Sequence, residues 1–316
     1  MHLGLFTDSV ENLTLEAALD LAQRIGVTGI EIATGGVSRR RHAQAEHLLA
    51  DAVARSSLVD GVESRGMRID ALNCSGLPMH PTIGGEQRRS IEATIRLAGE
   101  IGVRKVVTMS GTPGDGPAAS TVNWIWYPWP ADAVDLLERQ WDEAITLWQA
   151  LGRFAVDHGV DQIAFELHPL YLVYNVPTLL RMRDAVGPMI GANVDPSHMF
   201  WQQMDPLAVV RALGPAVFHV HLKDTAIVPD EVVLAGVLDS RPFENPGHRA
   251  WEFRTVGRSH DRAWWASFVR ALREAGYDGV LSIENEDERQ PAAEGVEEAA
   301  AFMGPILRDL ESGKVA

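Results

Sequence analysis

One apolar stretch gives the clearest sign of the fold, and it reads Phe218-His219-Val220-His221-Leu222-Lys223-Asp224. Apolar residues stand at alternate positions along it, which is the pattern of a short buried strand. Successive side chains of a strand point to opposite faces, so His219 and His221 share one face. Two imidazoles directed into one space indicate a site that needs them.

Three other segments follow the same pattern, a short apolar run that ends in charged or metal-coordinating residues. In each of them the polar residues come at the C-terminal end. A parallel β/α barrel builds its active site at that end of its strands. The three segments are residues 163–168, 191–198 and 281–287.

Strand and helix patterns alternate eight times along the chain. No glycine-rich GxGxxG turn follows the first strand, which disfavours a doubly wound nucleotide-binding sheet. We therefore predict one domain over residues 1–316, a single (β/α)8 TIM barrel of the α/β class. The strands are expected over residues 3–6, 29–34, 67–74, 105–109, 162–168, 190–195, 217–224 and 279–284.

Two connections are unusually long, residues 111–130 and 225–260, and we expect both at the C-terminal face of the barrel. Long irregular connections are typical of lids and binding loops. The first is rich in aromatic residues, which could stack on a sugar or a flat aglycone, or could instead form a dimer contact or the core of the loop. These residues are Trp124, Trp126, Tyr127 and Trp129.

Two helices carry further expectations. One long helix is predicted from about Arg41 to the region of Gly66, with a break along its length. Another is predicted over residues 131–158, where Trp141 and Trp148 are seven positions apart and so share one face. We expect these two indoles to pack against the barrel as core residues.

Bulk composition narrows the class of partner. The chain of 316 residues has 28 Lys and Arg against 43 Asp and Glu, a net charge of −15. Such a charge disfavours nucleic acid as a partner, because affinity for it comes from neutralising phosphates. Cys74 is the only cysteine, so neither an intrachain disulfide nor a thiolate metal cluster can form. With no secretory signal and no long apolar segment, we expect a cytoplasmic protein without a membrane partner.

Four residues at the ends of consecutive strands suggest a metal site. A strand-end carboxylate alone is usually a cap or an ion-pair residue. Four such groups together are different, since buried charges without a partner or a metal are very costly. Three carboxylates and one imidazole suit one divalent ion, Mn²⁺ first and Mg²⁺, Co²⁺ or Zn²⁺ as alternatives. The predicted ligands are Glu166, Asp195, His221 and Glu284.

A second layer of residues accompanies these ligands. His168 follows Glu166 two positions later on the same face, and we predict it as the catalytic base, because a neutral imidazole is available near pH 7. Glu166 and Glu284 are further candidates for acid/base roles. His219 is expected to hydrogen-bond a neighbouring carboxylate. The predicted substrate-binding residues are His198, Lys223, Glu286, Asn73, Trp126 and Arg254.

Several of these residues admit a purely structural alternative. An ion pair across the seventh and eighth strands would explain both Lys223 and Glu286. Glu31 and Asn73, at the ends of the second and third strands, have contact with substrate and a structural role as equal alternatives.

Taken together, the motifs resemble the xylose isomerase-like barrel superfamily of sugar phosphate isomerases and epimerases. The residues that carry the resemblance are Glu166-x-His168, Val194-Asp195-x-x-His198, His219-x-His221-x-Lys223-Asp224 and Ile283-Glu284-Asn285-Glu286, and the stretch from Asn73 to Pro81 is similar to the third-strand signature of one branch.

The resemblance implies one divalent metal on the four predicted ligands and a histidine, His198, that contacts substrate. Ketose 3-epimerases of the group commonly have Asn where His168 stands, which weakens the transfer of their activity. Endonuclease IV shares the fold but needs additional histidines, and residues 106–109 offer none. Glu-x-His together with a Trp-rich loop is similar instead to the catalytic subunits of C-glycoside deglycosidases.

The chemistry implied is removal of a proton next to the carbonyl of a keto- or oxo-sugar. From the resulting enediolate three outcomes are open: epimerisation, aldose/ketose isomerisation, or β-elimination from a 3-oxo-glycoside by a C–C lyase of the C-glycoside type. A sugar dehydratase of the inosose type is an alternative, and a non-catalytic, metal-stabilised assembly subunit is a more distant one. The expected partners are a small-molecule sugar or glycoside and further copies in a homo-oligomer, with a smaller second subunit as an added possibility.

Overall fold

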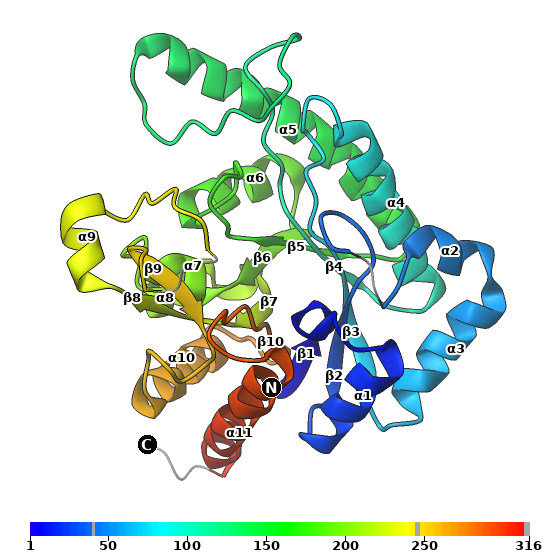
Figure 1. The fold of residues 1–316 in the computed structure, drawn as a ribbon. Coiled ribbons are helices and arrows are strands. Elements are labelled where there is room, and N and C mark those ends of the chain that lie inside the picture. Colours follow the sequence, from blue (N-terminus) through cyan, green and yellow to red (C-terminus); the bar gives the residue numbers. More distant parts are fainter. Residues whose placement is uncertain (40–41, 244–246, 313–316) are drawn as a thin grey trace. The chain divides into compact units, whose positions relative to one another are not determined.

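The computed structural model describes residues 1–39, 42–243 and 247–312. Its main-sheet strands are parallel and follow the closed order β1-β10-β7-β6-β5-β4-β3-β2 (Figure 1). The predicted (β/α)8 barrel is therefore confirmed. The chain divides into two compact units, which are described in turn, and the predicted boundary of one domain over residues 1–316 stays a prediction.

The first unit contains residues 1–31, 61–68 and 194–316. Strand β10 lies between β7 and β1, with Ser282 level with His221 and Ile283 level with Leu5. Helices α10 and α11 lie side by side (Figure 1). Its elements are β1 (His2–Phe6), η1 (Thr7–Val10), α1 (Leu15–Arg24), the start of β2 (Gly29–Ala33), α7 (Pro196–Phe200), α8 (Pro206–Leu213), η2 (Gly214–Ala216), β7 (Val217–Leu222), α10 (Arg262–Glu274), β10 (Val280–Ile283) and α11 (Ala292–Glu311).

The predicted irregular loop over residues 225–260 is wrong in part. It contains β8 (Asp224–Ile227), α9 (Pro229–Ala235) and β9 (Trp251–Arg254), and β8 pairs antiparallel with β9. Residues 244–246 within it lie outside the described part of the chain. Trp251-Glu252-Phe253-Arg254 does alternate aromatic and charged residues, the period of a strand, but its partner strand is 24 residues earlier in the chain. The long separation hid the pairing.

Aromatic packing holds this excursion together. Trp201 and Trp251 stack with ring centroids 4.7 Å apart, and Val232 of α9 packs against the same cluster. The carboxylate of Asp224 accepts hydrogen bonds from the backbone N–H groups of Gly257 and His260, at 3.1 and 3.0 Å. Residues 224–260 thus form an ordered arm in their described part.

The second unit contains residues 32–60 and 69–193. Strands β3, β4, β5 and β6 pair in sequence order. Trp141 and Trp148 of α5 are both buried, and Trp148 packs edge-on against Phe165, which confirms their predicted core role. The elements are α2 (Ala45–Ala50), α3 (Ala52–Glu63), β3 (Arg68–Cys74), α4 (Gly84–Glu100), β4 (Lys105–Thr108), α5 (Ala131–Asp157), β5 (Gln162–Glu166), α6 (Val176–Val186) and β6 (Ile190–Val194).

Asp51 explains the break in the predicted long helix. Helix α2 ends at Ala50, and the Asp51 carboxylate accepts hydrogen bonds from the N–H groups of Val53 and Ala54, so it caps α3. The described helix begins at Ala45 rather than near Arg41, which itself lies outside the described residues.

The aromatic loop over residues 111–130 contains no helix or strand, as predicted, and all of it is described. Gln140 of α5 fixes its backbone by donating hydrogen bonds to the carbonyl groups of Pro113, Gly114 and Asn123. Trp126 and Trp129 remain 53% and 72% exposed. The loop is therefore anchored at its base, while the indoles of Trp126 and Trp129 face solvent.

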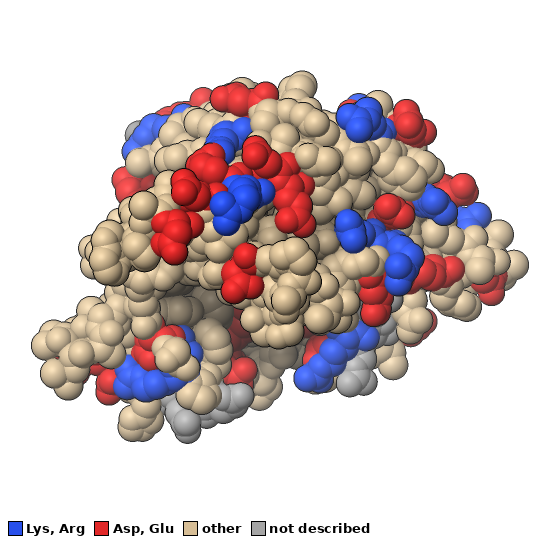
Figure 2. Space-filling model, turned by 90° about the horizontal axis from the view of Figure 1, so that it is seen from above, with Lys and Arg blue, Asp and Glu red and all other residues tan. Residues whose placement is uncertain are grey.

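Two further features concern the surface charge and the apolar length of the helices. Acidic and basic side chains are interspersed on the face shown in Figure 2. Among the described residues, no helix is both long and apolar enough to cross a membrane.

Candidate metal centre

The two histidines of β7 converge on one carboxylate. Nε2 of His219 donates to Glu31 Oε2 at 2.8 Å, and Nε2 of His221 donates to the same oxygen at 3.0 Å. Ser282 Oγ donates to this oxygen as well, at 2.7 Å. All four side chains are buried. The predicted contact of His219 with a neighbouring carboxylate is thus present, and the carboxylate belongs to Glu31.

Glu31 stays ionised in this setting. Complete burial acts to raise the pKa of its carboxyl group, but the charges and hydrogen bonds of His221 and His219 outweigh that effect and hold the pKa well below its usual range. The three donors on Oε2 hold the carboxylate against both imidazoles. We therefore assign Glu31 to orienting the imidazoles.

The other ring nitrogen of His221 faces Glu284. His221 Nδ1 lies 2.9 Å from Glu284 Oε2. Burial acts to lower the pKa of His221, but Glu31 and Glu284 together hold it well above its usual value. Phe6 stacks on the ring, with centroids 5.5 Å apart, so the imidazole is held on its face as well as at both nitrogens.

Asp195 presents its two oxygens to different partners. Oδ1 accepts a hydrogen bond from the N–H of Ser197 at 2.9 Å and so caps the short helix α7. Oδ2 is buried and accepts no well-aligned hydrogen bond from any residue that the structure describes. The cap fixes the carboxylate and turns its second oxygen toward a cation, the ammonium group of Lys223, whose Nζ is 3.0 Å away.

His198 lies beside this oxygen as a neutral base. Its Nε2 is 3.3 Å from Asp195 Oδ2, and its ring packs edge-on against Phe253. Burial lowers the pKa of His198 to about 4, although the charge of Asp195 acts in the opposite direction. The imidazole is therefore uncharged near neutral pH and able to exchange hydrogen bonds with a polar substrate.

Lys223 lies among three carboxylates. Its Nζ is 2.9 Å from Glu284 Oε2, 3.0 Å from Glu286 Oε2 and 3.0 Å from Asp195 Oδ2. Burial acts to raise the pKa of Glu284, but Lys223 and then His221 hold it well below its usual range. The ion pair weighed as a structural alternative for Lys223 and Glu286 is thus present.

The residues of this unit fit a divalent ion. Asp195, His221 and Glu284 each offer one ligand atom, and these atoms lie within 4.8 Å of one another. Carboxylate oxygen and imidazole nitrogen are the ligand types that Mn²⁺, Co²⁺ and Zn²⁺ share. Because Nε2 of His221 contacts Glu31, Nδ1 is the nitrogen that faces Glu284 and that would ligate an ion, the arrangement of a carboxylate–histidine–metal triad.

The predicted residues of strand β5 belong to the second unit. Glu166 is buried at the end of the strand. The pKa of the Tyr171 hydroxyl is raised, first by the burial of Tyr171 itself and then by the charge of Glu166. His168 Nδ1 lies 2.5 Å from the carbonyl oxygen of Pro169, which can only accept. Nδ1 therefore carries the proton, and a neutral His168 has its lone pair on Nε2.

Three predicted substrate contacts have structural partners. The side-chain oxygen of Asn73 accepts hydrogen bonds from the N–H and Oγ of Ser75, so it fixes the loop after β3. Arg254 Nε donates to Asp287 Oδ2 at 3.1 Å. Trp126 is exposed and leans against Tyr127. The contacts of these three residues with substrate stay predictions.

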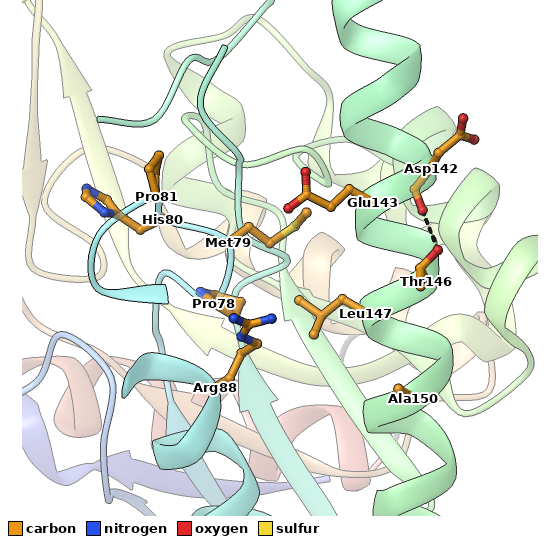
Figure 3. A pocket seen from close by; sticks show the side chains of 10 residues that line it. All are labelled: Pro78, Met79, His80, Pro81, Arg88, Asp142, Glu143, Thr146, Leu147 and Ala150. Atoms are coloured by element: carbon orange, nitrogen blue, oxygen red, sulfur yellow. Dashed lines mark hydrogen bonds between the residues drawn. The ribbon is translucent and has the colours of Figure 1, made fainter. Parts of the chain in front are cut away.

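A groove of about 650 Å³ also opens on the second unit, between residues 78–81 and α5 (Figure 3). Met79 and Leu147 form part of its apolar wall, while Arg88 and Glu143 add charged groups. None of the predicted site residues lines this groove.

Comparison with known proteins decides the family. The model of the xylose isomerase-like TIM barrel family matches residues 19–306. The chain belongs to this family. The predicted resemblance is thereby confirmed at the level of the xylose isomerase-like barrel, while the branch of the C-glycoside deglycosidases stays a prediction.

Relatives of this xylose isomerase-like barrel are of two kinds. The Bacillus subtilis (strain 168) protein YfiH, described as uncharacterized, is 40% identical over 291 residues, which cover 91% of this chain and 93% of YfiH. Solved structures share the fold at lower identity. L-Ribulose 3-epimerase has a TM-score of 0.65 at 15% identity, covering 99% of this chain and 96% of its own. The IolI protein with a bound zinc atom has a TM-score of 0.68 at 19% identity, with 97% and 98% covered.

Sequence reasoning left two residues of this family member without a definite role. For Glu31, contact with substrate and a structural role were equal alternatives, and the carboxylate expected beside His219 was not identified. Phe253 carried no prediction, yet its ring contacts His198 and lies 4.8 Å from Lys223 Nζ. No local signal in the sequence marks Phe253, because it reaches these residues through the arm.

Proposed function

We propose that this chain is a divalent-metal-dependent enzyme that removes a proton next to the carbonyl of a keto- or oxo-sugar and returns it to give the epimer or isomer. The observation that carries the proposal is the convergence of Asp195, His221 and Glu284, with Glu31 holding the imidazole so that Nδ1 faces the carboxylates. Family membership and the fold shared with sugar epimerases support enzyme status.

The bound ion would polarise the sugar carbonyl and make the neighbouring carbon acidic. Mn²⁺ is the ion we propose first, because carboxylates predominate in the ligand set. We propose Glu166 as the fourth ligand. It is buried at the carboxyl end of β5, and a carboxylate is a ligand type that these divalent ions share.

His168 is the base we propose. Its Nδ1–H donates to the carbonyl of Pro169, which fixes the ring and puts the lone pair on Nε2, the atom that would take a proton from carbon. This hydrogen bond keeps His168 in the tautomer whose Nε2 can accept a proton. Glu166 and Glu284 are the carboxylates that would deliver or hold a proton if the product requires a second group.

His198 and Lys223 serve in this proposal as substrate contacts. The neutral imidazole of His198 can accept or donate to a sugar hydroxyl, and Phe253 beside it offers an apolar ring face. The exposed indole of Trp126 could cover a sugar or an aglycone from the loop over residues 111–130.

β-Elimination is the second candidate, and the aromatic loop favours it. A 3-oxo-glycoside that loses its C2 proton expels the aglycone from C1, including a carbon-linked aglycone that is a good carbanion leaving group. A flat aglycone can stack on an exposed indole. A sugar dehydratase of the inosose type would begin with the same removal of a proton next to the carbonyl. A probable 3-DHS dehydratase, AsbF from Bacillus anthracis, shares the fold with a TM-score of 0.69 at 16% identity, covering 96% of this chain and 99% of its own.

Deuterium exchange tests the proposal. The Mn²⁺-loaded protein is incubated in D₂O with a panel of ketoses and 3-oxo-glucosides, and both exchange and products are measured. Exchange at a carbon next to the carbonyl supports proton abstraction, and the product separates a rearranged sugar from a released aglycone. No exchange with any compound, in protein that holds one ion per chain, contradicts the proposal for these substrates. The His168→Ala variant is the matched control, because it keeps the proposed metal ligands.

A further inference from the structure

Lys223 is a deeply buried cation of the site. Its side chain is 2% exposed, and Nζ has three carboxylate oxygens within 3.0 Å. Burying an ammonium group is costly unless it is paired. The three carboxylates of Asp195, Glu284 and Glu286 supply that pairing, and the ring of Phe253, 4.8 Å from Nζ, adds a cation–π contact.

Two of these carboxylate oxygens are also the atoms that a metal ion needs. Lys223 Nζ contacts Asp195 Oδ2 and Glu284 Oε2. Glu284 Oε2 is also the oxygen that faces Nδ1 of His221. An ammonium group and a divalent ion that share two oxygens lie only a few ångströms apart, and their repulsion in a buried site is strong. They compete for the same negative charge.

Glu286 differs from the other two carboxylates. Its side chain is 50% exposed, whereas that of Asp195 is fully buried and that of Glu284 is 11% exposed. It has no place among the predicted metal ligands. Because the lysine stem is flexible, Nζ can stay on Glu286 while it leaves the other two oxygens.

We propose that Lys223 is a built-in counter-cation, which neutralises Asp195 and Glu284 in the metal-free protein and is displaced toward Glu286 when a divalent ion binds. The inference rests on the proposed metal site. It assigns Lys223 two opposite effects, since the ammonium stabilises the metal-free fold and weakens the affinity for the ion. A lysine that merely oriented the ligands would strengthen metal binding instead.

Calorimetric titration with Mn²⁺ of protein stripped by chelator tests the inference. The Lys223→Met variant keeps the length of the side chain and removes the charge. We expect its Kd for Mn²⁺ to fall at least tenfold and the Tm of its metal-free form to fall below that of the wild type. An unchanged or weaker affinity overturns the inference. If this variant does not fold without metal, Lys223→Gln replaces it, since it removes the charge and keeps a polar end. Its Kd for Mn²⁺ should also fall.

A second variant tests the displacement itself. Glu286→Gln removes the carboxylate that receives the ammonium, so it should weaken Mn²⁺ binding several-fold in the wild-type background. In the Lys223→Met background the same change should have a clearly smaller effect, because no ammonium has to move. Equal effects in both backgrounds contradict displacement toward Glu286.

Lys105→Met on β4 is the matched control and should leave the affinity for Mn²⁺ unchanged. The outcomes separate the two proposals. If the wild type binds no Mn²⁺, the metal site and this inference both fail. If the wild type binds one ion and the Lys223 variants bind it no more tightly, only the role of Lys223 fails.

Discussion

Glu31 Oε2 lies 3.0 Å from Nε2 of His221, and this contact leaves Nδ1 as the nitrogen that faces Glu284. The carboxylate therefore selects which imidazole nitrogen can reach a metal ion, although it stands in the middle of a different strand, β2 (Gly29–Ala33), and not at its end as the sequence suggested. Ser282 and His219 hold the same oxygen from two further directions. A carboxylate with this many donors is positioned to fix its partner.

Substitution of Glu31 should weaken metal binding without removing any proposed ligand. We expect Glu31→Gln to raise the Kd for Mn²⁺ by 10- to 100-fold, roughly the range found for partners of metal-ligating histidines. Equilibrium dialysis measures it. An affinity equal to that of the wild type would show that Glu31 has no orienting role.

Removal of the proposed base should separate chemistry from metal binding. His168→Ala should lower the rate of deuterium exchange by about 10²- to 10⁴-fold, the usual range for general acid–base catalysis, with one ion still bound per chain. His80→Ala, in the loop after β3, is the control and should exchange at the wild-type rate. A normal rate in the His168 variant would move the role of base to another residue.

Core packing of α5 should dominate the stability of its unit. Trp148 is fully buried, donates from Nε1 to the carbonyl of Ser110 at 2.8 Å and packs against Phe165. Trp148→Ala should lower the free energy of unfolding by roughly 3–5 kcal/mol. Trp126→Ala, at an exposed indole, should change it by less than about 0.5 kcal/mol. Urea denaturation compares the two, and equal effects would contradict the packing described.

Prediction from the sequence succeeded where a periodic pattern and its physical cause lie close together in the chain. The strand from Val217 to Leu222 alternates in its own six residues, and the eightfold repeat of strand and helix is enough to favour a barrel. Trp141 and Trp148 could be assigned to the core by their spacing alone.

The parts that were missed depend on partners far apart in the chain. Glu31 meets His219 across 188 positions, so no local pattern could distinguish an orienting carboxylate from a substrate contact. Strands β8 and β9 are separated by a long segment of the chain, so no local pattern predicted their pairing. The hydrogen bond of Arg254 to Asp287 also joins residues far apart in the chain, while its predicted contact with substrate stays a prediction.

The stoichiometry of Mn²⁺ tests the central claim most directly. Equilibrium dialysis followed by elemental analysis should find one ion per chain in the wild type and a large loss in Asp195→Asn, which keeps the shape of the side chain and removes its charge. Glu16→Gln, in the first turn of α1, is a control that should retain the ion. Absence of bound ion in the wild type, or full retention in Asp195→Asn, would contradict the assignment of Asp195, His221 and Glu284 as the metal centre.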